Sequence, residues 1–213
     1  MRVKTRTLAA LTADDNGIAL AQNTTAGTPL TLEAGAASLS PPRQLSFDAA
    51  ADISGIIFTV VGKDRAGNTI TETVTGVTTT PVSTVGIYAS VTSITPDTTD
   101  GVNSVFVGWT DEVISAPIML DHFRNPFNVG VTVDVTGTVS YTVEHTQSDL
   151  QNAEGQSASI YEGLGFWLPH ATLAAATTDG DGNYAFAVEA IRVRKTGTGS
   201  IVLRAMQSGV RGA

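Results

Sequence analysis

Hydrophobic and polar residues alternate with a period of two along much of the chain. The apolar run "GIIFTVV" (55–61) leads into the turn sequence "GKDRAGNT", and "ITETVTGV" then places a threonine at every second position. Side chains of a β-strand point alternately to opposite faces of a sheet, so this pattern predicts a strand pair with one polar face. Gly67 and Asn68 tolerate the positive φ that a tight turn requires.

Two further alternating pairs follow toward the C-terminus. Valine occupies every odd position of 129–135, and 139–145 continue with Val, Tyr, Val and His after Thr136 and Gly137. The last pair is predicted between about 187–193 and 200–207, across "RKTGTG". Shorter strands are predicted at 84–91, 102–109 and 113–120. Short strands separated by such turns predict an all-β fold, an antiparallel β-sandwich or a jelly-roll-like architecture.

The first 44 residues lack this periodicity. They are rich in Ala, Thr and Gly, and Pro41 and Pro42 follow them. Because proline removes a backbone donor and restricts its predecessor, we expect a boundary there. Residues 1–44 are therefore predicted to be an extended N-terminal arm, and 45–213 a β-sandwich domain. An alternative divides that domain into two packed β-units, about 45–119 and 120–213.

Composition supports the β prediction and excludes several kinds of chemistry. Thr and Val are abundant, and β-branched side chains suit a pleated sheet. The 213 residues include no cysteine, which excludes disulfides, zinc–thiolate sites and thiol catalysis and fits folding in a reducing cytoplasm. We expect no membrane partner, because no segment approaches the roughly 20 apolar residues that span a bilayer. The apolar stretch 8–11 is also too short for a signal peptide.

The net charge of −8 is unevenly distributed. Residues 7–191 contain all 20 acidic and only 4 basic residues, a net −16, whereas the two ends carry +8. One interpretation is that the terminal cations contact a partner of opposite charge. The candidates for that contact are Arg2, Lys4, Arg6, Arg192, Arg194 and Lys195. The other interpretation is that both ends fold back onto the acidic middle. Nucleic-acid binding is not expected, since no basic stripe is interleaved with aromatic residues.

The densest polar cluster is "LDHFRNPFN" (120–128). Pro126 imposes an extended or turn geometry on the residue before it. Asp121 and Arg124 are close enough in sequence to tie such a corner with a charge-assisted hydrogen bond, and Phe123 and Phe127 would anchor it. We therefore interpret Asp121, Arg124, Pro126 and Phe127 as a structural corner at a strand entry. No nucleophile or paired base accompanies His122, so no catalytic residue is predicted.

The remaining candidate motifs do not complete a site. His145 extends an apolar strand face and is predicted to be a half-buried residue at the rim of that face. The "DGDGN" sequence (179–183) begins like a calcium loop, but Tyr184 and Ala190 stand where such a loop needs Gly and Glu. A Gly/Asp turn is the better interpretation. No cofactor and no metal is predicted, and 166–168, "FWL", are expected to anchor to the core.

Three segments resemble structural proteins of tailed bacteriophages. The run "PIMLDHFRNPFNVGVTVDVTGTVSYTVEHTQSD" (117–149) is similar to a segment of small virion proteins of these phages. "FTVVGKDRAGNTITETVTGV" with the later "VTSIT", and "AIRVRKTGTGSIVLRAMQSG", resemble other segments of the same class. Together these segments cover most of residues 45–208.

The resemblance implies a non-enzymatic virion component assembled in the host cytoplasm. A head decoration (cement) protein that binds the major capsid protein is the first expectation, as a homo-oligomer for which a trimer is one arrangement. A tail, baseplate or head–tail accessory protein is the alternative. A further alternative, a carbohydrate-binding or adhesion module, follows from Trp109, Trp167 and Tyr161 as sugar platforms.

Overall fold

The chain is built from antiparallel β-structure. The computed structural model describes residues 3–211 except 79, 122, 149 and 151–165. Within these residues, every pairing between strands is antiparallel, and the helical structure consists of one 3₁₀ turn, Ala34–Ala37. The predicted all-β antiparallel sandwich is confirmed. Across the described part of the chain, no helix has the length and apolar character needed to cross a bilayer.

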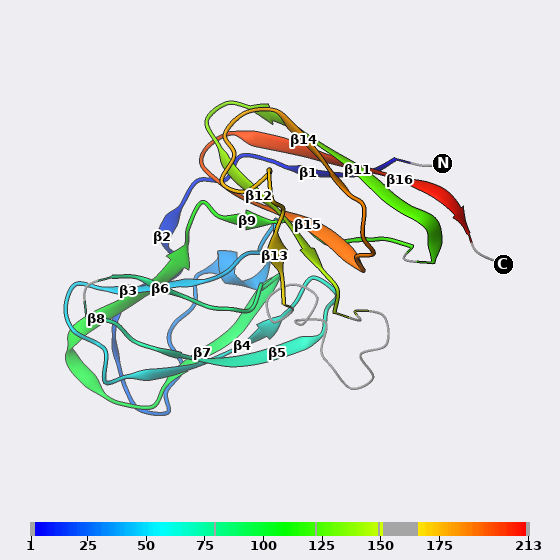
Figure 1. Ribbon diagram of the computed structural model, residues 1–213. Helices are drawn as coiled ribbons and strands as arrows, with labels where there is room; N and C mark the ends of the chain where they lie inside the picture. The colour runs from blue at the N-terminus through cyan, green and yellow to red at the C-terminus, as the bar shows by residue number, and fades with distance from the viewer. Residues whose placement is uncertain (1–2, 79, 122, 149, 151–165, 212–213) are drawn as a thin grey trace. The chain divides into compact units, whose positions relative to one another are not determined.

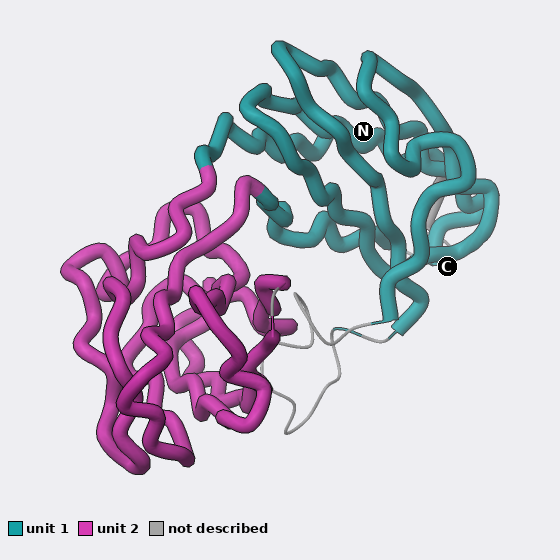
Figure 2. Tube along the Cα trace, turned by 90° about the vertical axis from the view of Figure 1, so that its left-hand side faces the viewer, with its two compact units in different colours: residues 1–12, 112–155, 160–213 teal, residues 13–111, 156–159 magenta. Residues whose placement is uncertain are grey.

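The chain forms two compact units, each with its own core (Figure 2). Unit 2 contains Ala13–Asp111, and the described residues on either side of that segment belong to unit 1. The chain therefore begins in unit 1, builds unit 2, and returns to complete unit 1. This division differs from both predicted divisions, because the N-terminal segment is shared between the units.

Unit 1 consists of two sheets (Figure 1). Sheet I has the order β1 (Lys4–Leu8), β16 (Ser200–Arg211), β11 (Arg124–Thr136) and β14 (Gly180–Tyr184). Sheet II has the order β10 (Ile118–Met119), β15 (Ala190–Thr196), β12 (Ser140–Thr146) and β13 (Leu168–Pro169), and β9 (Val113–Ile114) also pairs with β15. Alternate residues from both sheets, such as Val131, Val143 and Leu203, form one buried cluster.

Two predicted hairpins of unit 1 are instead connections between its sheets. β11 pairs with β14 and β16, whereas β12 pairs with β13 and β15, so 129–135 and 139–145 are not hydrogen-bonded to each other. β15 and β16 are likewise in different sheets. The predicted alternation of buried and exposed residues is present, but the two apolar faces meet across the core. The turns at Gly137 (φ 84°) and Gly197 (φ 93°) lie together, where Gly199 N donates to Thr138 O (2.7 Å).

Unit 2 is a second pair of sheets around a separate core. Sheet III has the order β2 (Asp14–Thr24), β8 (Asp100–Trp109), β3 (Ser46–Ala49) and β6 (Val82–Ser83), and sheet IV has the order β5 (Thr69–Thr75), β4 (Ile57–Lys63) and β7 (Ser90–Pro96). The first predicted hairpin is present as β4–β5, from Ile57↔Thr75 to Lys63↔Thr69. Phe47 and Phe58, with ring centroids 5.2 Å apart, are central to the buried cluster.

The predicted extended arm, residues 1–44, is wrong. β1 is an edge strand of sheet I, β2 pairs along β8, and Leu30, Ala36 and Leu39 are buried in the core of unit 2. The physical reason is that the β2–β8 pairing contains three register shifts. Each shift interrupts the alternation of side chains, so β2 shows no sustained period of two in its sequence.

Candidate functional site

Four charged side chains form a ladder on the face of sheet II opposite the core. Arg192 Nε donates to Glu144 Oε2 (2.6 Å), Glu144 Oε1 lies 3.5 Å from Arg194 Nε, and Arg194 Nη1 lies 3.1 Å from Glu112 Oε1. The guanidinium of Arg192 lies 4.1 Å from the centroid of the Trp167 ring. We call Glu112, Arg194, Glu144, Arg192 and Trp167 the charge ladder.

Strand register explains why the ladder forms. Glu144 of β12 lies directly opposite Arg192 of β15, and Arg194 is two residues further along the same face. Opposite charges on neighbouring strands attract at this spacing, and an arginine–carboxylate hydrogen bond is stronger than a neutral one. Arg192 is only 3% exposed, so the pair replaces hydration that the guanidinium loses.

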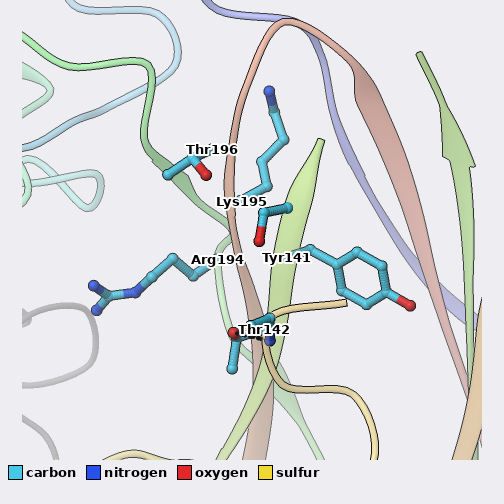
Figure 3. A pocket seen from close by; sticks show the side chains of 7 residues that line it. Tyr141, Thr142, Arg194, Lys195 and Thr196 are labelled. Atoms are coloured by element: carbon cyan, nitrogen blue, oxygen red, sulfur yellow. Dashed lines mark hydrogen bonds between the residues drawn. The ribbon is translucent and has the colours of Figure 1, made fainter. Parts of the chain in front are cut away.

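A depression of about 170 Å³ adjoins the ladder (Figure 3). It is lined by Ser140, Tyr141, Thr142, Ala175, Arg194, Lys195 and Thr196. Figure 3 shows Arg194, Lys195 and Tyr141 extending in three different directions, so their polar ends do not converge on one point. Thr142 Oγ1 accepts a hydrogen bond from Ala175 N (3.0 Å). The arrangement contains no nucleophile held by a base, which is the geometry that covalent catalysis requires.

Lys195 is fully buried and lies near the end of β15, just before the turn that leads to β16. Its Nζ donates to Gly197 O (3.0 Å) and Gly199 O (2.8 Å). Arg192 and Lys195 are thus buried and bound to groups of unit 1, so they are not the surface contacts that the charge pattern predicted. Arg194 is partly exposed, but Glu112 and Glu144 engage it. The interpretation in which the C-terminal cations fold back onto the acidic middle describes Arg192 and Arg194, whereas Lys195 binds carbonyls of the turn that follows its own strand.

The N-terminal cations connect the two sheets of unit 1. Lys4 and Arg6 alternate with outward-facing threonines on β1. Lys4 Nζ donates to Met119 O, and Arg6 donates to Ala116 O (3.0 Å) and Pro117 O (2.9 Å). These carbonyls flank or belong to β10, so both cations close the open edge of the sandwich. Inward-pointing charges on an edge strand oppose pairing with another chain. Arg2 lies outside the described residues.

The predicted corner forms at the start of β11. Arg124 Nε lies 3.6 Å from Asp121 Oδ2, and Phe123 N donates to Asp121 Oδ1 (3.2 Å). Phe127 packs against the core, as expected, and Pro126 is exposed. The expected anchoring by Phe123 is wrong, because its residue is 67% exposed. His122 lies outside the described residues.

An aromatic cluster joins the sheets of unit 1 near β13 and β14. The ring of Tyr184 lies 5.0 Å from that of His145 and 4.8 Å from that of His170, and Phe186 lies 5.5 Å from His145. Burial raises the pKa of Tyr184, and Glu144 adds to the effect. Burial, followed by the nearby His170, lowers the pKa of His145 from 6.5. At 8% exposure, His145 is more enclosed than the predicted rim position.

One aspartate of the "DGDGN" segment binds the backbone, and the other lies in a strand. Asp179 Oδ1 accepts a hydrogen bond from Val135 N (2.7 Å), and Asp181 lies opposite Thr132 in the β11–β14 register. In the part of the chain that the structure describes, no group of three His, Cys, Asp or Glu residues is placed to hold a metal ion.

An arginine covers one face of each of the two tryptophan rings. Arg43 lies 4.3 Å from the ring centroid of Trp109 in unit 2, and Arg192 covers Trp167 in unit 1. A sugar platform needs an accessible ring face, and arginine occupies one face of each ring through a cation–π contact. Tyr161 lies outside the described residues. Phe166 and Leu168, predicted to anchor to the core, are 71% and 41% exposed.

Sequence reasoning missed several members of these clusters. Glu112, Glu144, His170 and Tyr184 were not singled out as partners. One signal in the sequence could have indicated the ladder: Arg192 and Arg194 share one face of a strand. Two cations on one face require acidic residues on a neighbouring strand. The register that brings Glu144 to them joins residues 48 positions apart, and local periodicity does not encode it.

Comparisons with known proteins do not assign a family. No protein-family model matches the chain, and no curated protein matches it. Two solved structures of infectious bursal disease virus, from the Gt and Gx strains, align at 10% and 11% identity with TM-scores of 0.20 and 0.19. The alignments cover 95% and 100% of this chain and 70% and 72% of those chains. TM-scores this low do not establish a common fold.

Proposed function

We propose that this protein is a non-enzymatic structural component of a tailed-phage virion, a capsid decoration protein that binds the major capsid protein. The observation that carries the proposal is the use of charged side chains inside unit 1. Arg192, Lys195, Lys4 and Arg6 each bind a carboxylate or carbonyl of their own unit. These four cationic side chains thus stabilise the fold of their own unit. This role agrees with the resemblance of residues 45–208 to virion structural proteins.

The β-architecture supports the same role. Two sandwiches with separate cores present several sheet faces without a catalytic constellation among the described residues. Symmetric assembly uses one contact surface many times, so modest contacts accumulate into stable attachment. The protein would act as a homo-oligomer on the head, with a trimer as one arrangement, and would stabilise the shell.

Copy number in purified particles tests this proposal. Quantitative mass spectrometry of intact virions should find this chain at a copy number near that of the major capsid protein. Mild heating should release the chain and leave particles that rupture more readily. A stoichiometry of only a few to tens of copies would instead support a tail or baseplate protein. Absence from particles would overturn both.

A further inference from the structure

The aromatic cluster joins two weakly held edge strands of unit 1. β13 has two residues and β14 has five, and each pairs with only one neighbouring strand among the described residues. His145 projects from β12 of sheet II, Tyr184 from β14 of sheet I, and His170 follows β13. The contacts of Tyr184 with both imidazoles therefore connect the two sheets where backbone pairing is short.

His170 makes hydrogen bonds that fix its neutral tautomer. Its Nδ1 accepts from Thr172 N (3.2 Å), so the ring proton lies on Nε2, which donates to Asn183 O of β14 (3.3 Å). A proton on Nδ1 would place two donors, Nδ1–H and Thr172 N–H, against each other. The ring also packs on β14, because a Cβ at Gly182 would lie 2.5 Å from His170 Cε1. A change at His170 therefore acts directly on β14.

His145 is equally unsuited to a positive charge. Its Nδ1 is buried without a hydrogen-bond partner among the described residues. The charged groups around it are Glu144 on the opposite face, which is paired with Arg192 and Arg194, and the buried Glu189 that precedes β15. Burial, followed by the nearby His170, lowers the pKa of His145.

The direction of the pH effect follows from this lowering. As the pH falls below 6.5, the unfolded chain takes up a proton at His145 before the folded chain does. The contribution of His145 to stability is therefore complete above pH 6.5 and declines below it.

We propose that the buried His145, which packs with His170 on Tyr184, is the pH-sensitive element of a joint that holds β13 and β14 in unit 1 at neutral pH and releases them in mild acid. The joint is independent of the proposed place in a virion. It would let one end of unit 1 open while its remaining strands stay paired.

Hydrogen exchange of the full chain tests the joint. Exchange is measured at about pH 7.5 and about pH 5.5, on either side of the unperturbed histidine pKa of about 6.5, and is corrected for intrinsic rates. Amides of 168–184 should lose about tenfold of their protection at the lower pH. Amides of the β4–β5 hairpin in unit 2 are the internal control and should keep theirs. Equal protection of 168–184 at both values would overturn the proposal.

Histidine variants identify the groups responsible. The double variant His145→Phe/His170→Gln should keep 168–184 protected in acid, and the matched control His122→Gln should lose protection as the wild type does. If amides of 168–184 still lost protection at the lower pH in the double variant, the proposal would be contradicted. NMR titration of the wild-type protein needs no variant to fold: the His145 imidazole should titrate below 6.5, and titration at or above that value would also contradict it.

Discussion

Unit 1 and unit 2 are both antiparallel sandwiches, but they satisfy buried polar groups in different ways. Unit 1 uses ion pairs between strands, such as Glu144–Arg192, and cations that donate to carbonyls. Unit 2 uses carboxylates that accept backbone N–H groups in its connections. Asp64 binds Ala66 N and Asn68 N, and Glu72 binds Val85 N and Gly86 N.

The difference follows from where the basic residues lie in the chain. Both basic ends belong to unit 1, which has nine basic and ten acidic residues, a net −1. Unit 2 has three basic and ten acidic residues, a net −7. A unit with few cations cannot neutralise its carboxylates in pairs, so backbone donors stabilise them instead. The charge asymmetry of the sequence thus appears as two ways of holding a sandwich together.

The largest expected effect comes from breaking the ion pair in unit 1. Glu144→Gln leaves the buried Arg192 without a full counter-charge, and we expect a loss of about 3 kcal/mol in the free energy of unfolding. Chemical denaturation followed by hydrogen exchange would measure the loss and assign it to unit 1. Asp134→Asn is the matched control, because its pair with Arg204 is exposed and should contribute less than about 1 kcal/mol. Equal losses in both variants would show that burial does not set the difference.

A smaller loss should follow in unit 2 when a carboxylate is removed. Asp64 is 2% exposed, and Asp64→Ala leaves the amides of Ala66 and Asn68 without their acceptor. We expect unit 2 to lose about 2 kcal/mol, since each bond to a charged group is worth more than a neutral one. Asp64→Asn retains one acceptor and should recover part of the loss. The same denaturation experiment measures it, and destabilisation of unit 1 instead would contradict the comparison.

The extent of sequence-based prediction also differs between the units. The β4–β5 hairpin was predicted because its strands are consecutive and its turn carries Gly67 at a φ of 88°. The connections at Gly137 and Gly197 were misassigned because strands joined within one sheet and strands facing across a core show the same alternation. β2 was missed because its register shifts remove that alternation. Local patterns thus predicted the faces of strands but not their neighbours.

The same limit applies to the candidate site. Arg192, Arg194 and Lys195 were singled out by charge, and the Asp121–Arg124 corner by spacing. The corner is local, within four residues, and Asp121 and Arg124 form an ion pair there, although Phe123 does not anchor it. The roles of Arg192 and Lys195 depend on Glu144 and on the carbonyls of Gly197 and Gly199, which only the folded turn and the β12–β15 register position.

The two units should lose stability at different pH values as the solution is acidified. Backbone hydrogen bonds from Ile57 and from Asn103 lower the pKa values of Asp97 and Asp100 below 3.8. Their contribution to stability is present above 3.8 and is lost as the pH falls through the lowered values. Unit 2 should therefore weaken only in strong acid, after unit 1 has responded through His145. Thermal unfolding across the pH range would measure this order. In the double variant Asp97→Asn/Asp100→Asn, the stability of unit 2 should depend less on pH in strong acid.

The smallest expected effect is a gain in unit 1. Ala175, beside the charge ladder, has a φ of 52°, a left-handed conformation that costs an alanine more than a glycine. Ala175→Gly should raise the free energy of unfolding by about 1 kcal/mol, because relief of this strain exceeds the added entropy of the unfolded chain. Ala176→Gly is the control at the next position, where the backbone pairs with Tyr141 and the side chain packs on the core. It should lose stability, by about 1 kcal/mol. Opposite signs at adjacent alanines, measured by denaturation, would show that unit 1 contains a strained loop beside its charge ladder. A loss of stability in both variants would show that Ala175 is not strained.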